Sequence, residues 1–335
     1  MSKRPTAKAP TNDLAKAVIA GDRRALARAI TLIESTRSDH GAEAAALLDQ
    51  LLPAAGKSIR IGISGAPGVG KSTFIETFGL HVIGRGRRLA VLAVDPSSKI
   101  GGGSILGDKT RMAELAKQDA AFIRPSPAGE TLGGVARRTR DAMIATEAAG
   151  FDVTVVETVG VGQSETTVAE MVDLFVLILQ PGAGDDLQGM KRGIVELADL
   201  ILVNKSDGEL LAAAGRTAAD YQHAIRLLHP PTPGWTPEVR QCSALTGGGV
   251  PEVWKAVEQF RAAMTRSGQL PARRREQAKA ALERELAASL LAVLESDPDL
   301  SRRVKACEAK VAAGKMAPTA AAAAIAEALR PALRH

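Results

Sequence analysis

The chain has 335 residues, 45% of them hydrophobic, which is enough to fill the core of one large α/β domain with helical additions or of two small domains. Lys and Arg total 43 against 37 Asp and Glu, so the net charge of +6 is modest, and its scattered distribution does not indicate a nucleic-acid-binding protein. Aromatic residues make up 3% of the chain and offer few surfaces on which bases can stack. The basic run 273–275 is interpreted as a solvated helix face or a linker in preference to a binding patch.

Cysteine content and hydropathy indicate the compartment. Cys242 and Cys307 are the two cysteines, too few for a disulfide framework and without a C-x-x-C spacing, which favours a reducing compartment. The first ten residues lack the apolar core of a signal peptide, and no apolar run approaches the roughly 20 residues of a membrane helix. We therefore expect a cytoplasmic protein without a membrane partner.

The expected elements follow one another in the order of an α/β protein. Residues 1–10 are expected to be disordered, and helices are expected over 12–35 and 39–52, followed by the helix breakers Pro53 and Gly56. From residue 59 to about 259, short apolar runs alternate with helical stretches, the pattern of a mainly parallel sheet covered by helices on both faces. Strands are expected at 59–64, 89–94, 121–124, 153–157, 174–179, 200–204 and 239–243.

The segment after residue 271 has a different composition, rich in Ala, Glu and Arg, and predicts helices over 273–294, 298–313 and 318–333. Its first helix carries an apolar stripe at helical spacing. The stripe either packs on its own domain or pairs with another copy, and composition leaves both open. It consists of Ala278, Leu282, Leu286, Leu290 and Val293.

A glycine-rich stretch lies where a phosphate-binding loop must lie, after the strand at 59–64 and before a helix at 72–84. Its pattern G-x-x-x-x-G-K-S predicts a P-loop, whose backbone N–H groups hold phosphate oxygens, with Lys71 on the β and γ phosphates and Ser72 on Mg²⁺. This context makes an incidental glycine turn a poor alternative. The predicted phosphate-binding residues are Gly65, Ala66, Pro67, Gly68, Val69, Gly70, Lys71, Ser72 and Thr73.

A second motif, N-K-S-D at 204–207, predicts the base that is bound. Guanine presents two adjacent donors that one carboxylate, Asp207, can accept, whereas adenine offers an acceptor there. Lys205 can lie along the ring with its alkyl stem. Alone this motif is weak, but the order of P-loop, N-K-x-D and a following C-S-A-L stretch is typical of GTP-binding domains. The predicted base pocket consists of Asn204, Lys205, Asp207, Ser243, Ala244 and Leu245.

The stretch between these motifs holds the predicted metal and γ-phosphate shell. Glu157 ends a buried strand at the Walker B position, where it acts on Mg²⁺ directly or through a water, and Gly160 follows with an N–H for the γ-phosphate. Asp95 follows another strand and is a candidate for Mg²⁺ or for the attacking water, with an N-cap or turn role as the alternative. Asp108 completes the predicted metal set of Ser72, Asp95, Asp108 and Glu157, and the predicted catalytic residues are Lys71, Asp95 and Glu157.

Two further glycine-rich loops are expected to change conformation. The loop at 101–111 carries Lys109 and Arg111 and resembles a nucleotide switch. The loop at 181–191, with Asp185, Gln188 and Lys191, is interpreted either as a relay to a partner or as an ordinary connection.

With these motifs in sequence, at 65–73, 95–112, 157–164 and 204–207, the chain resembles the MeaB/ArgK family of methylmalonyl-CoA mutase-associated GTPases, within the SIMIBI class of P-loop GTPases. The resemblance covers at least residues 57–260. It implies a N-terminal helical extension (1–56), a GTPase domain (57–268) and a C-terminal helical arm (269–335) that contributes to a homodimer. It also implies a partner, adenosylcobalamin-dependent methylmalonyl-CoA mutase, for which such proteins act as GTP-hydrolysing chaperones that gate cofactor loading, protection and reactivation.

Alternatives to this interpretation predict different chemistry. The family has also been called an arginine-transport kinase, which predicts a nucleotide-dependent kinase or ATPase of an amino-acid transport system, although Asp207 argues against ATP as the donor. A metal-inserting GTPase would need His or Cys clusters, and five scattered histidines argue against it. Val161 stands where Ras-like GTPases carry their water-orienting glutamine, and Gln163 lies further on, so we expect slow intrinsic hydrolysis. Basic residues that can complete the site are Lys109, Arg111, Arg137, Arg138 and Arg140.

Overall fold

The computed structural model describes residues 9–94, 112–125, 132–158, 164–182 and 192–332. The chain divides into two compact units, Met1–Arg273 and Arg274–His335. Several predicted site residues lie outside the described residues: Asp95, Asp108, Lys109, Arg111, Gly160, Gln163, Asp185, Gln188 and Lys191.

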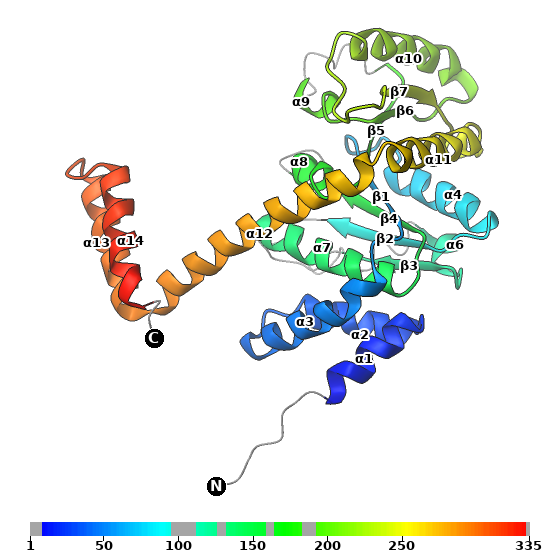
Figure 1. Ribbon diagram of the computed structural model, residues 1–335. Coiled ribbons are helices and arrows are strands. Elements are labelled where there is room, and N and C mark those ends of the chain that lie inside the picture. Colours follow the sequence, from blue (N-terminus) through cyan, green and yellow to red (C-terminus); the bar gives the residue numbers. More distant parts are fainter. Residues whose placement is uncertain (1–8, 95–111, 126–131, 159–163, 183–191, 333–335) are drawn as a thin grey trace. The chain divides into compact units, whose positions relative to one another are not determined.

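A seven-stranded sheet forms the centre of the first unit, in the order β3-β2-β4-β1-β5-β6-β7. In Figure 1 the strand labels follow the reverse of this order, from β7 at the top to β3 at the bottom. Every pairing between the described strands is parallel; Ile61 of β1, for example, lies opposite Val155 of β4 and Leu174 of β5. The predicted α/β class is therefore confirmed. The strands are β1 (Ile59–Ser64), β2 (Leu89–Val94), β3 (Ala121–Arg124), β4 (Val153–Thr158), β5 (Leu174–Leu179), β6 (Leu200–Val203) and β7 (Glu238–Gln241).

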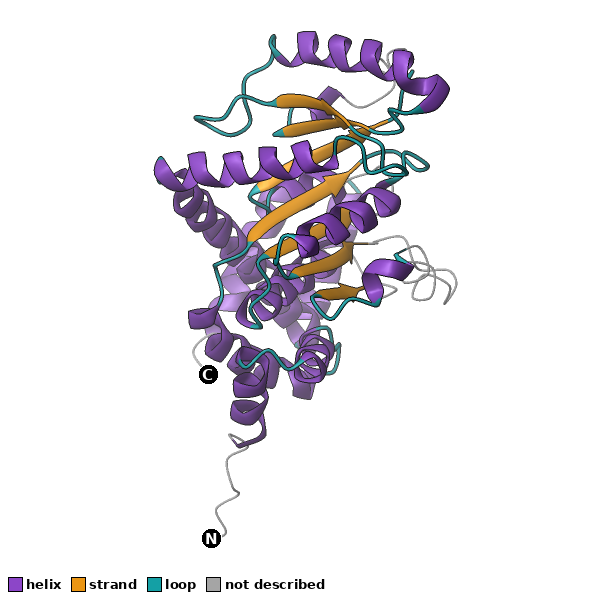
Figure 2. Ribbon diagram, turned by 90° about the vertical axis from the view of Figure 1, so that its right-hand side faces the viewer, coloured by secondary structure: helices purple, strands orange, loops and turns teal. Residues whose placement is uncertain are grey.

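Helices cover both faces of this sheet because its central strands are apolar on both faces (Figure 2). The residues of β5 alternate between two cores, with Leu174, Val176 and Ile178 in one and Phe175, Leu177 and Leu179 in the other. The first core contains α4 (Lys71–Gly84), α6 (Ala113–Ala116) and α11 (Val250–Arg266). The second contains α7 (Leu132–Ala148), α8 (Ser164–Ala169), α9 (Arg192–Val195) and α10 (Leu211–Ile225).

The N-terminal section packs on α7 as three helices, α1 (Ala9–Ile19), α2 (Arg23–Ile33) and α3 (Ser38–Leu51). The expectation of one helix over 12–35 was therefore wrong. Gly21 adopts a φ of 83°, which ends α1, and the Asp22 carboxylate then caps α2 by accepting the N–H of Ala25 at 2.7 Å. The pair Gly-Asp carried this signal in the sequence.

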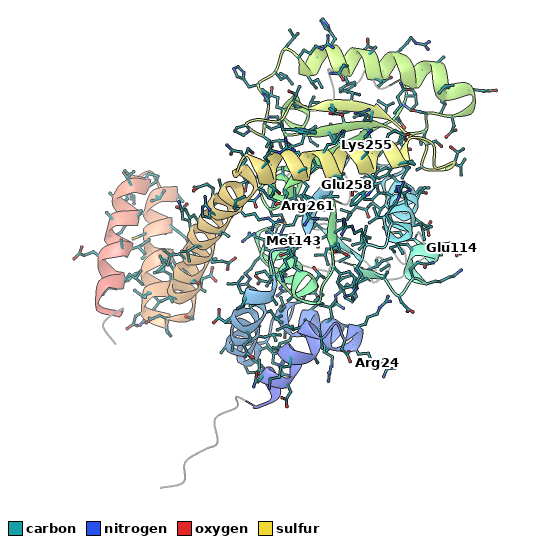
Figure 3. All side chains as sticks on the ribbon, turned by 45° about the vertical axis from the view of Figure 1, so that its right-hand side comes forward. Arg24, Glu114, Met143, Lys255, Glu258 and Arg261 are labelled. Carbon is teal, nitrogen blue, oxygen red and sulfur yellow. The ribbon has the colours of Figure 1, made fainter. Side chains whose placement is uncertain are left out.

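A buried carboxylate joins the connection after α3 to the sheet. Glu147 of α7 accepts the Gly56 N–H at 2.6 Å, the Ser58 hydroxyl at 2.7 Å and the Arg60 Nε at 2.7 Å. A second Arg60 nitrogen reaches the other Glu147 oxygen at 3.0 Å, which makes the pair bidentate. On the opposite face, Arg261 of α11, labelled in Figure 3, donates to the Lys57 carbonyl at 2.7 Å.

The C-terminal helices are α12 (Gln269–Ser296), which begins in the first unit, α13 (Pro298–Ala312) and α14 (Pro318–Ala332). Asp297 caps α13 by accepting the N–H groups of Asp299 and Leu300 at 2.8 and 3.0 Å. The α12 stripe is exposed at Leu282 (69%) and Leu286 (57%). Among the described helices, none has the length and apolar content to cross a membrane.

Candidate functional site

The loop between β1 and α4 depends on glycine at two positions. A Cβ at Gly65 would lie 2.3 Å from the Ile178 carbonyl oxygen, closer than any real Cβ contact. Gly70 adopts a φ of 92°, and a Cβ there would lie 2.7 Å from the Asn204 side-chain nitrogen. The loop therefore packs directly against β5 and against the segment that follows β6, and both contacts require the absence of a side chain.

Lys71, the first residue of α4, turns its side chain back into this loop. Its Nζ donates to the Gly65 carbonyl at 2.7 Å and to the Ala66 carbonyl at 3.2 Å, and the residue is only 9% exposed. The ammonium is thus held inside the loop at the N-terminus of α4, where backbone N–H groups also favour an anion.

Ser72 and Glu157 meet across the end of the sheet. The Ser72 hydroxyl donates to Glu157 Oε1 at 3.1 Å, and Glu157 is 5% exposed at the end of β4. The neighbouring Thr158 hydroxyl donates to the Ser64 hydroxyl at 2.9 Å, which joins the ends of β4 and β1. A serine hydroxyl beside a carboxylate is the pair of hard oxygen donors that Mg²⁺ takes in nucleotide sites, so these two residues fit that ion. No cluster of three or more His, Cys, Asp or Glu side chains able to hold a metal occurs among the described residues.

Asn204 joins the glycine-rich loop to the segment after β7. Its Nδ2 donates to the Val69 carbonyl at 2.8 Å, and its Oδ1 accepts the Ala244 N–H at 2.9 Å. Lys205, in the left-handed region with a φ of 57°, donates through Nζ to the Gly68 carbonyl at 2.8 Å. Both side chains therefore contact the predicted phosphate-binding loop, and that of Asn204 also contacts Ala244 of the predicted base pocket.

Asp207 lies beside the same segment and accepts a hydrogen bond from the Ser243 hydroxyl. Ser243 is held in turn, because its N–H donates to the Gly248 carbonyl at 2.8 Å. Ala244 is buried, whereas Leu245 is 82% exposed. Burial raises the pKa of the thiol of Cys242, the residue directly before Ser243, to about 12.

The structure thus places the described members of the predicted site at the carboxyl ends of β1, β4 and β6 and in the segment after β7. This is the edge at which parallel α/β sheets bind ligands. The roles assigned to individual residues stay predictions.

Sequence reasoning missed two contacts of α4. The Thr77 hydroxyl donates to the Ala244 carbonyl at 2.7 Å. The Glu76 carboxylate accepts the N–H groups of Glu114 and Leu115, at 2.8 and 3.4 Å, and so caps α6, where Figure 3 labels Glu114. Both residues follow the P-loop on the same helix, but nothing in the local pattern names their distant partners.

Comparisons with known proteins give consistent results. The family model described as "Methylmalonyl Co-A mutase-associated GTPase MeaB" matches residues 26–299. The Escherichia coli protein named GTPase ArgK is 47% identical over 282 residues, covering 84% of this chain and 85% of that protein. The mouse protein named methylmalonic aciduria type A homolog, mitochondrial, is 45% identical over 315 residues, covering 91% and 76%. A crystal structure described as an LAO/AO transport system kinase has a TM-score of 0.76 at 36% identity and covers 98% of this chain and 100% of its own.

Proposed function

Because this chain belongs to the MeaB family of P-loop GTPases and is a GTP hydrolase, we propose that it uses GTP hydrolysis to time the handling of an adenosylcobalamin-dependent methylmalonyl-CoA mutase. The observation that carries this proposal is the family match over residues 26–299, which includes the whole nucleotide site. The name of the mouse relative, which refers to methylmalonic aciduria, supports the same partner. In this role the protein is a chaperone that gates cofactor loading and protects or reactivates the mutase.

The contacts of the nucleotide site suggest a separate role for each of its parts. Backbone N–H groups of the loop at 65–70 and the N-terminus of α4 hold the phosphates. The Lys71 ammonium, now shared between two carbonyls, turns to the β and γ phosphate oxygens, which are stronger acceptors because they are charged. Ser72 and Glu157 would hold Mg²⁺, which neutralises charge on the phosphate oxygens when bound. Asp95 and Asp108 belong to the proposed shell but lie outside the described residues.

Base selection is assigned to Asp207. Its carboxylate accepts the two adjacent donors of guanine, while Ser243, which now donates to it, keeps it oriented. Asn204 holds the wall of the pocket through Ala244. The nucleotide is therefore GTP or GDP, in agreement with the family.

A dimer is also part of the proposal. The exposed residues Leu282 and Leu286 of α12 form an apolar stripe of the kind that pairs helices between two copies. Light scattering coupled to size exclusion should give twice the mass of the 34.9 kDa chain, and Leu286→Glu should give monomers. A wild-type monomer at working concentration would contradict this part.

A second candidate is a kinase of an amino-acid transport system, which the name of the similar crystal structure, an LAO/AO transport system kinase, favours. The two functions differ in where the γ-phosphoryl group goes. A GTPase transfers it to water, and a kinase transfers it to a side chain of a protein.

The deciding experiment measures hydrolysis of GTP labelled in the γ-phosphate by the purified protein with Mg²⁺, alone and with apo and holo methylmalonyl-CoA mutase. ATP is the parallel nucleotide control. We expect slow release of free phosphate from GTP alone, a changed rate with the mutase, and no turnover of ATP. Label that stays on a protein would favour the kinase. An unchanged rate with no complex on size exclusion would remove the mutase as the partner while leaving the GTPase in place.

A further inference from the structure

Thr77 lies in the second turn of α4, on the helix that begins with the phosphate-binding lysine, and its partly buried hydroxyl reaches the base-pocket segment. It donates to the Ala244 carbonyl at 2.7 Å, a residue 167 positions away in the sequence. We propose that Thr77 is a positioning residue for guanine specificity, which acts through Ala244 and does not touch the base. This inference rests on the proposed base pocket around Asp207.

The argument starts from a closed path of hydrogen bonds. Thr77 fixes the carbonyl of Ala244, and Asn204 fixes its N–H at 2.9 Å. The same Asn204 side chain donates to the Val69 carbonyl at 2.8 Å, and the backbone of Gly70 connects Val69 to the start of α4. The path therefore joins the phosphate loop, the pocket segment and α4, and Thr77 supplies a direct hydrogen bond from α4 to the pocket segment.

Fixing both polar groups of Ala244 also fixes its neighbour. Ser243 precedes it directly and donates its hydroxyl to Asp207, so a shift of the segment moves the donor that orients this carboxylate. A carboxylate that must accept two adjacent guanine donors tolerates little displacement, because hydrogen bonds weaken steeply with angle. Phosphate binding uses the loop at 65–70 and is shared by every nucleotide. Loss of the Thr77 hydroxyl should therefore weaken guanine nucleotides more than adenine nucleotides.

The test measures the dissociation constants of ADP and of GDP by titration calorimetry with Mg²⁺ on the full chain. The quantity compared is the ratio of the ADP constant to the GDP constant. Thr77→Val keeps the shape of the side chain and removes the donor. A net hydrogen bond corresponds to about a 2- to 10-fold change in affinity, so we expect the ratio to fall by about that factor through weaker GDP binding. Thr77→Ser keeps the donor and should stay within about twofold of wild type.

The matched control is Thr146→Val on α7, which removes a buried threonine hydroxyl bonded within its own helix, to the Met143 carbonyl at 2.9 Å. It should leave the ratio unchanged. Thr77→Ala removes the same donor in a good helix former and carries the test if the valine variant does not fold. An unchanged ratio in both donor-deleting variants, or equal weakening of GDP and ADP, would overturn the inference.

Asp207→Asn separates this inference from the pocket on which it rests. If Asp207→Asn lowers the ratio and the Thr77 variants do not, only the positioning role fails. If Asp207→Asn leaves the ratio at its wild-type value, the assignment of the base pocket fails and the inference fails with it.

Discussion

The buried pair of Arg60 and Glu147 allows a stability prediction with a worked magnitude. The Glu147 side chain is fully buried and that of Arg60 is 16% exposed, so Glu147→Leu leaves a guanidinium with little access to water. It also removes the acceptor for the Gly56 N–H and the Ser58 hydroxyl. Breaking a buried pair in this way costs about 3–5 kcal/mol of unfolding free energy. With about 2–4 °C per kcal/mol for a domain of this size, the melting temperature should fall by about 6–20 °C.

Tryptophan fluorescence isolates this effect, because both tryptophans, Trp235 and Trp254, lie in the first unit. The double variant Arg60→Met with Glu147→Leu should recover part of the loss, since it leaves no unpaired charge but still lacks the acceptor of the Gly56 N–H and the Ser58 hydroxyl. Glu114→Gln removes an exposed pair with Lys117 and should cost less than about 1 kcal/mol. A double variant no more stable than Glu147→Leu alone would refute the reasoning, because the cost would then not come from the stranded charge.

Four further outcomes are expected. Gly70→Ala places a Cβ 2.7 Å from the Asn204 side chain at a left-handed φ and should abolish measurable GDP binding in calorimetry; wild-type affinity would contradict the close packing of the loop. Glu157→Gln keeps the size of the side chain and removes its charge, so GTP turnover should need at least about tenfold more Mg²⁺ for half-maximal rate, and an unchanged Mg²⁺ dependence would remove Glu157 from the metal shell. In a Cys307→Ser background, Cys242 should react slowly with a thiol reagent at about pH 8, because its pKa in the folded protein is about 12. Bound GDP should slow the reaction further. Fast labelling that GDP does not change would place the thiol outside the pocket. The unfolded thiol ionises near 9.0, so this group makes stability fall as pH rises from about 9 to about 12.

Local sequence patterns were sufficient where a segment's own residues fix its conformation. The apolar runs at 59–64, 89–94, 121–124 and 174–179 are strands with those bounds, because each is a short β-branched or apolar run between turn residues. The last two strands end earlier than expected, β6 at Val203 and β7 at Gln241. The backbone pairing fades gradually there, since the N–H groups of Asn204 and Cys242 still donate to the Leu179 and Val203 carbonyls at 2.8 and 2.9 Å. The break at Gly21 was missed because the apolar spacing continues across it in the sequence, while the backbone turns.

The sequence by itself determined the α/β class and predicted which residues bind phosphate and base, because both patterns extend over only a few neighbouring residues. Only the tertiary structure decided which of them hydrogen-bond directly to one another. Ser72 and Glu157 are 85 positions apart, and Asn204 and Val69 are 135 apart. These contacts form because the strand order β2-β4-β1-β5-β6 brings the ends of the strands together. The crossover connections determine this order, and the local hydrophobic periodicity carries no information about it. For the same reason Thr77 and Glu147 are unremarkable in the sequence and acquire partners only when the sheet brings those partners to them.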